Sequence, residues 1–183
     1  MFDAEVKVKA LPVREWLDRY CFPGRFLDAC RACPDYGRVW SCPPGVPEAE
    51  ALLGAYRTVF LVGVKVRYCP TDQERALRSP EEAETVRQET YGVAKKALLE
   101  ALLALEGLCP GATTVAAGRC EQCESCTRVD GLPCRKPERM RYSFSAFGFD
   151  LAALAKEQLD IDLLWADRGL PAYHAALAAF LTR

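Results

Sequence analysis

The chain has 183 residues and a net charge of -1, and half of its residues are hydrophobic. A chain of this length fits one domain and buries roughly 70% of its unfolded surface, so a hydrophobic core can stabilise it without disulfide bonds. The charge excludes the basic field with which many proteins bind nucleic acid, and we expect no nucleic-acid partner.

The apolar runs are far shorter than the roughly 20 residues that span a bilayer, so we expect no membrane segment. The first residues, Met1 to Glu5, lack the basic and apolar regions of a secretory signal. The sequence therefore predicts a cytoplasmic protein. In that reducing compartment, ten cysteines indicate metal binding or redox chemistry rather than disulfides.

The first half of the chain alternates regular and irregular segments. Residues 4–9 alternate polar and apolar side chains, which predicts a half-buried strand. Residues 21–47 hold four cysteines among prolines and glycines and are typical of a loop that builds a site. A short helix is expected over 47–54. The β-branched run 58–66 predicts a strand that is buried on both faces in the middle of a sheet.

The clearest boundary is a helix start, with Ser79 at the N-cap, Pro80 at the first position and Glu82 at the capping-box position. Apolar residues keep a helical period from Val86 until Gly107 ends the helix, and one stripe is expected to pack on the sheet. Residues 112–117 predict a strand that leads into a second cysteine loop. Ser143 or Asp150 could cap a further helix, and the alanine-rich segment 170–182 is ambiguous.

Together these elements predict an α+β or α/β fold. We expect a single metal-binding domain over residues 1–183, with a mixed sheet, packed helices and two cysteine-rich metal loops brought together at one end. The first cysteine loop comprises residues 21–47, and the second cysteine loop comprises residues 119–141.

Three cysteines separated by two residues each begin the motif of the second loop. This spacing lets one compact turn aim three thiolates at one iron-sulfur cube, as in bacterial ferredoxins. The next cysteine follows after seven residues, where a ferredoxin has three, so a ferredoxin is not implied. The pair Asp130-Gly131 supplies a turn that could fold this cysteine back. We predict one 4Fe-4S cluster bound by Cys120, Cys123, Cys126 and Cys134.

The first loop offers a CxxC pair and a third cysteine after eight residues, namely Cys30, Cys33 and Cys42. We expect these to bind metal as well, in a second cluster, in a zinc site or in a cluster shared by both loops. The spacing does not choose among the three. A fourth ligand is not obvious, and Cys21 and Cys69 are the candidates.

Zinc is the main alternative, because it also binds four thiolates. Zinc ribbons usually present two separated CxxC pairs, and the triple repeat of the second loop exceeds what one ion takes from one turn. With zinc, the chain would be a structural or interaction module without redox activity. A third hypothesis is an enzyme in which three cysteines of the first loop leave one iron open to substrate, so the sequence leaves open whether the chain is an enzyme.

Two blocks of residues carry a family resemblance. They are Cys30-x-x-Cys33-Pro-x-Tyr36-Gly37-x-x-Trp40-x-Cys42-Pro43-Pro44, and the run from Cys120 to Pro137 followed by Met140-Arg141-x-Ser143 and Gly148. Over roughly residues 20–160 the chain resembles the uncharacterised family 2284 of predicted metal-binding proteins. The resemblance implies metal or iron-sulfur binding, no particular reaction, and a strand over 170–182. Ser145 stands where family members commonly carry a glutamate.

Cations flank the second loop, and they could offset the negative charge of a cluster or form an ordinary solvated basic surface. They are Arg119, Arg128, Arg135, Lys136, Arg139 and Arg141. Tyr36 and Trp40 are expected to pack under the first loop. The only histidine, His174, is far from the cysteines in sequence and is expected to be an ordinary, partly buried side chain.

Glycine-rich loops for dinucleotides or phosphates do not occur in the sequence. A flavin or nicotinamide would therefore have to sit on another protein. We expect a protein redox partner, while the sequence leaves the oligomeric state, the substrate and the pathway open.

Overall fold

An antiparallel sheet of four strands forms the centre of the computed structural model, which describes residues 2–183. Met1, the first residue of the predicted domain, lies outside the described residues. The strands β1 (Asp3–Pro12), β2 (Thr58–Arg67), β4 (Tyr173–Thr182) and β3 (Thr113–Val115) lie side by side in that order. With its helices the chain is a single α+β domain, as predicted. Parallel pairing, expected for a mixed sheet, is limited within residues 2–183 to an isolated bridge between Ala116 and Ser143.

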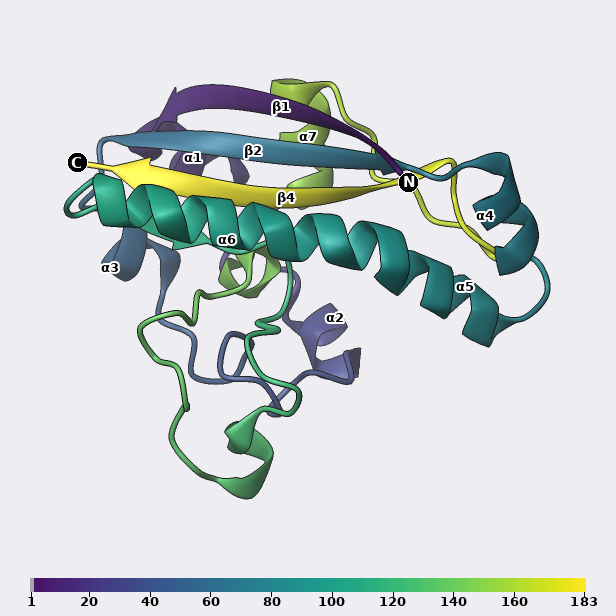
Figure 1. Cartoon of the computed structure of the whole chain (residues 1–183). Coiled ribbons are helices and arrows are strands. Elements are labelled where there is room, and N and C mark those ends of the chain that lie inside the picture. The colour runs from purple at the N-terminus through teal and green to yellow at the C-terminus, as the bar shows by residue number, and fades with distance from the viewer. Residues whose placement is uncertain (1) are drawn as a thin grey trace.

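Helices cover both faces of the sheet (Figure 1). The long helix α6 (Val93–Leu108) crosses one face, whereas α1 (Val13–Tyr20) and α7 (Leu151–Leu159) lie on the other. The shorter elements are α2 (Leu27–Ala32), α3 (Ala49–Leu53), α4 (Pro70–Ala76), α5 (Pro80–Arg87), the π-helical turn η1 (Gln88–Gly92), and the 3-10 turns η2 (Thr127–Asp130) and η3 (Phe144–Phe147). Both cysteine loops extend from the same side of this layered body.

Strand β2 is buried on both faces, as its β-branched run predicts. Its odd-numbered residues, such as Val59 and Leu61, belong to the core formed with α1 and α7. Its even-numbered residues from Val62 to Val66 belong to the core formed with α6. Successive side chains of a strand point to opposite faces, so one central strand serves two cores.

Strand β1 is present where the alternation predicts it, but its valines are not buried. Val6 and Val8 pair with Val64 and Val62 of β2, which places them on the face that α6 covers. They are nevertheless 60% and 59% exposed. Helix α6 packs on β2, β3 and β4 and leaves this edge of the sheet open. The half-burial predicted for this strand is therefore not found on its valine face.

The predicted helix over 79–107 is present but interrupted. The Ser79 hydroxyl accepts a hydrogen bond from the Glu82 amide at 3.2 Å, which confirms Ser79 as the N-cap, while the Glu82 carboxylate pairs with Arg75. Between α5 and α6 lies the π-helical turn η1, which inserts a residue into the helical repeat and rotates the apolar stripe. Consequently Val93 is 49% exposed, while Ala94 faces the sheet.

The ambiguous segment 170–182 forms the central strand β4, as the family resemblance implies. Its alanines suit this place, because Ala176 and Ala178 let α6 approach the sheet closely. In contrast, α1 was not predicted, although Val13, Trp16, Leu17 and Tyr20 show the spacing of a buried helical face.

Position 63, in the middle of β2, requires a glycine because the end of α7 and the residues after it pack closely against the strand there. A Cβ at this position would lie 2.7 Å from Cδ1 of Ile161 and 2.9 Å from Cδ1 of Leu159. Both side chains are buried in the core under α1 and α7, so neither can move into solvent. The missing side chain of Gly63 therefore lets α7 seat on the sheet.

Gly63→Ala should lower the free energy of unfolding by about 1–3 kcal/mol, because it overpacks this contact. Urea denaturation measures the change. Gly107→Ala is the matched control, since nothing lies within 4 Å of its Cβ position in α6. The control should leave stability equal or raise it by roughly 0.5–1 kcal/mol, as alanine favours a helix over glycine. Equal destabilisation by both variants would contradict the packing argument.

Candidate metal centre

The four cysteines of the second loop line one cavity of about 70 Å³. The cavity wall includes Cys120, Cys123, Cys126 and Cys134, together with Val39 and Trp40 of the first loop and Met140. All ten cysteines within residues 2–183 are free thiols. The fold thus gathers four sulfur donors from one short stretch of chain around a common space.

A left-handed turn returns the last of these cysteines to the others. The turn η2 follows Cys126 directly, and Gly131 ends it with φ of 68°. The Thr127 hydroxyl donates to the Pro133 carbonyl at 2.8 Å, and the Leu132 amide donates to the Thr127 carbonyl at 3.1 Å. The turn expected at Asp130-Gly131 is therefore present. It spans the seven residues that separate the third and fourth cysteines.

Arg128 fastens the second loop to the first. Its guanidinium donates to the carbonyls of Val39 at 2.8 Å and Cys42 at 2.7 Å, and also to that of Pro44. The same group lies 5.0 Å from the centre of the Trp40 ring. The Trp40 indole N-H in turn donates to the Leu132 carbonyl at 3.2 Å. These contacts hold both cysteine loops in one irregular lobe.

Ser41 is a second connection that sequence reasoning missed. Its side chain is buried, and its hydroxyl accepts from the Cys120 amide at 2.8 Å. Its carbonyl accepts from the Ser143 amide at 3.0 Å. Ser41 of the first loop therefore holds Cys120, at the start of the second loop, and Ser143, just after the end of that loop. The only signal in the sequence was a small polar residue between Trp40 and Cys42.

A family model described as "Predicted metal-binding protein (DUF2284)" matches residues 6–177. The chain belongs to this family. No curated protein and no solved structure matches it. Membership makes this chain a predicted metal-binding protein, in agreement with the resemblance seen in the cysteine motifs. The family description names no particular metal. Within residues 2–183, none of the helices has the length and apolar character needed to cross a bilayer.

Within residues 2–183 of this DUF2284 chain, no group of three or more cysteine, histidine, aspartate or glutamate side chains is arranged to hold one metal ion. The four thiols of the second loop nevertheless line one shared cavity.

Burial and the neighbouring thiols disfavour the charged form of Cys120. Burial raises the pKa of Cys120, and the neighbouring Cys134, Cys123 and Cys126 raise it further. Thiolates packed this closely repel one another unless a cation lies among them. The cavity wall also contains three cations, Arg119, Arg135 and Lys136, and two carboxylates, Glu121 and Glu124, so positive charge is in slight excess beside the sulfurs. This donor set is suited to a cationic metal centre.

The first loop also places its three cysteines near one another. Burial raises the pKa of Cys42, and smaller contributions in the same direction come from Asp35, Cys33 and Cys30. Cys30 lies on α2, and Cys33 follows the helix directly and is exposed. The Asp35 carboxylate lies near this group and accepts a hydrogen bond from Arg119 at 2.9 Å.

The two candidates for a fourth cysteine of the first loop are placed elsewhere. The Cys21 thiol packs against the core under α1 and donates to the Phe147 carbonyl at 3.4 Å, and burial raises its pKa to about 11. Cys69 is the residue before α4, which lies outside the lobe of the two loops (Figure 1). Neither is gathered with Cys30, Cys33 and Cys42.

Most cations that flank the second loop are bound to protein groups and are not simply solvated. Arg139 pairs with Glu100 of α6 at 2.5 Å, and Arg141 pairs with Glu106 of the same helix. The Lys136 ammonium donates to the Gln122 carbonyl at 2.7 Å. The basic residues therefore anchor the loop to α6 in addition to supplying positive charge.

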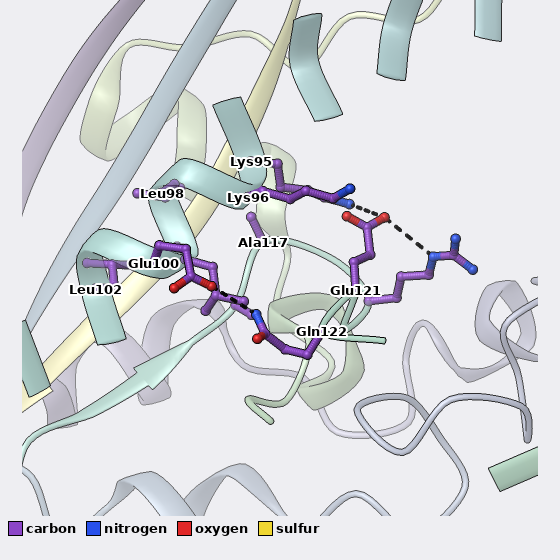
Figure 2. Close-up of a pocket in the computed structure, with 12 residues that line it drawn as sticks. Lys95, Lys96, Leu98, Glu100, Leu102, Ala117, Glu121 and Gln122 are labelled. Atoms are coloured by element: carbon purple, nitrogen blue, oxygen red, sulfur yellow. Dashed lines mark hydrogen bonds and ion pairs between the residues drawn. The ribbon is translucent and has the colours of Figure 1, made fainter. Parts of the chain in front are cut away.

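Residues that follow Cys120 also bind the second loop to α6 (Figure 2). The Glu121 carboxylate lies 2.9 Å from the Lys95 ammonium and 3.5 Å from Nε of Arg119. The Gln122 amide donates to Glu100 at 3.3 Å. These contacts form one side of a cavity of about 290 Å³ between α6 and the loop. Helix α6 thereby positions the first cysteine of the second loop.

Arg128→Ala should loosen both loops, because it leaves three backbone carbonyls without their charged donor at a cost of about 2–3 kcal/mol. Hydrogen exchange followed by mass spectrometry should show faster exchange in residues 37–45 and 119–134 by tenfold or more, since about 1.4 kcal/mol corresponds to tenfold.

Arg135→Ala is the matched control in the same loop, because its guanidinium reaches the Ser125 carbonyl only at 3.4 Å. It should leave exchange in residues 37–45 unchanged. Equal exchange in the two variants would show that Arg128 does not join the loops.

Proposed function

We propose that this chain is an iron-sulfur protein that transfers electrons. Cys120, Cys123, Cys126 and Cys134 would hold one 4Fe-4S cluster. The observation that carries the proposal is that these four thiols, three of them in a Cys-x-x-Cys-x-x-Cys motif, line a single cavity. When bound, such a cluster accepts and donates one electron at a time.

The spacing of the donors favours a cluster over zinc. Four thiolates around one zinc ion at about 2.3 Å lie roughly 3.8 Å from one another, which is the arrangement of a closed structural site. A cube of iron and sulfide has its own volume and holds its four cysteines further apart. The triple Cys-x-x-Cys-x-x-Cys spacing exceeds what one zinc ion takes from one turn, which favours the second case.

The surroundings of the cavity supply what a buried anionic cluster needs. Trp40 and Met140 contribute apolar surface, and the cationic side chains of Arg135 and Lys136 lie in the same wall. Positive charge close to the sulfurs favours the reduced, more negative state, and apolar surface limits access of water. The residues of this chain would thus set the reduction potential.

Electrons must reach and leave the lobe through another protein, because the sequence has no nucleotide motif. Each of the four thiols is partly exposed, so the cavity lies at the surface of the lobe. We propose that a protein redox partner docks there. The first loop, with Cys30, Cys33 and Cys42, would be a second metal site.

Metal analysis of anaerobically purified protein tests the proposal. One cluster gives about four iron and four sulfide per chain, with broad brown absorption, and a second cluster doubles both. A colourless protein that contains zinc and no sulfide would contradict it and would support the structural alternative.

Substitution of single cysteines shows which loop binds the iron. Cys120→Ala and Cys123→Ser should each remove the cluster of the second loop, whereas Cys109→Ala, at the end of α6, should retain it. Cys30→Ala should remove only the metal of the first loop. Unchanged iron and sulfide in both second-loop variants would show that the cluster is not bound there.

A further inference from the structure

A cavity of about 480 Å³ lies between the turn from α4 to α5 and the segment 165–171. Among the described residues that line it there is no cysteine, so it is separate from the metal centre. Its volume is within the range of roughly 300–1,000 Å³ that is typical of small-molecule sites. Neither the family description nor the proposed electron transfer accounts for it.

Contacts among its walls fix the shape of this cavity. The Gln73 amide donates to the Pro171 carbonyl at 3.3 Å, and Arg168 donates to the Leu77 carbonyl at 3.4 Å. Gly169 has φ of 69°, and a Cβ there would lie 3.0 Å from Leu77. The segment 165–171 is therefore held close to the end of α4 and forms a definite wall.

Positive charge is in excess around the cavity. Three arginines, Arg78, Arg87 and Arg168, line it with two carboxylates, Glu84 and Asp167. Arg87 is neutralised by Glu84, with the two groups 2.6 Å apart. Among the described residues, neither Arg78 nor Arg168 forms an ion pair. The cavity thus presents two arginines against one aspartate, which favours a ligand with a negative charge.

His174 lines the same cavity and adds an imidazole to its wall. Its Nδ1 lies 2.5 Å from the Tyr68 hydroxyl. Burial raises the pKa of Tyr68 to about 12 and, together with the charge of Arg87, lowers the pKa of His174. A protonated phenol can donate to Nδ1 of a neutral imidazole, and in that tautomer the ring proton is on Nε2. The imidazole can therefore donate one hydrogen bond from Nε2.

Two large apolar side chains complete the lining. Trp165 is 79% exposed and Leu77 is 50% exposed, although each belongs to the wall of the cavity. An exposed indole offers a flat surface on which a ring can stack, and arginines stack on aromatic rings as well. The cavity combines a flat apolar surface, unpaired cations and a neutral hydrogen-bond donor.

We propose that this cavity binds a small organic anion with a flat, apolar body. The anionic group would lie between Arg78 and Arg168, the ring would stack on Trp165, and His174 would donate a hydrogen bond to an acceptor on the ligand. The site does not depend on the metal centre, so its test is independent of the iron content.

The probe is 2-naphthoate, and the control ligand is 2-naphthamide, which has the same shape without the charge. His174 is the only histidine, so its imidazole signals in the proton NMR spectrum report on the cavity without assignment by mutation. In the full chain, 2-naphthoate should shift these signals saturably below about 10 mM, whereas the amide should bind at least tenfold more weakly.

Arg78→Gln combined with Arg168→Gln should weaken 2-naphthoate binding at least tenfold, with the His174 signals of the free protein unchanged. Arg14→Gln is the matched control, because it removes an exposed arginine of α1 that is bound to Asp18 and Glu50. The control should bind as the wild type does. Absence of a shift at about 10 mM, equal binding of acid and amide, or equal binding by the double variant would overturn the proposal.

Discussion

The guanidinium of Arg128 is the contact on which the cysteine lobe depends. The lobe has little regular secondary structure, so its backbone carbonyls cannot all be satisfied by helices or sheet ladders. One side chain serves three of them, at Val39, Cys42 and Pro44, and also stacks on Trp40. Hydrogen bonds from a charged donor contribute about 1.5–3 kcal/mol each, more than neutral ones, which suits a lobe with few other restraints.

The sheet and α6 provide the rigid body on which this lobe is built. Strand β3 leads directly into the second loop, and α6 presents Glu100 and Glu106 to the arginines that follow the cysteines. Gly63 and the alanines of β4 allow helices to seat closely on both faces of the sheet. The layered core therefore also helps to position the cysteines of the second loop. The cavity around His174 lies in a different part of the same body.

Local signals predicted several elements correctly. The β-branched run gave β2, and Ser79 with Glu82 gave the start of α5, because capping is decided within four residues. Predictions failed where distant packing decides. The turn η1 rotates the apolar stripe and exposes Val93. The segment 170–182, which local preference left ambiguous, is the strand β4 because small side chains fit under α6.

By itself, the sequence determined the number and spacing of the cysteines and the Asp130-Gly131 turn that returns Cys134, since both are properties of neighbouring residues. It also determined membership of a family of predicted metal-binding proteins. Only the tertiary structure decided that Arg128 and Ser41 join the two loops and that arginines meet His174 in a second cavity. The physical reason is that their partners are backbone carbonyls, amides and cavity walls distant in the chain, which leave no pattern in the sequence.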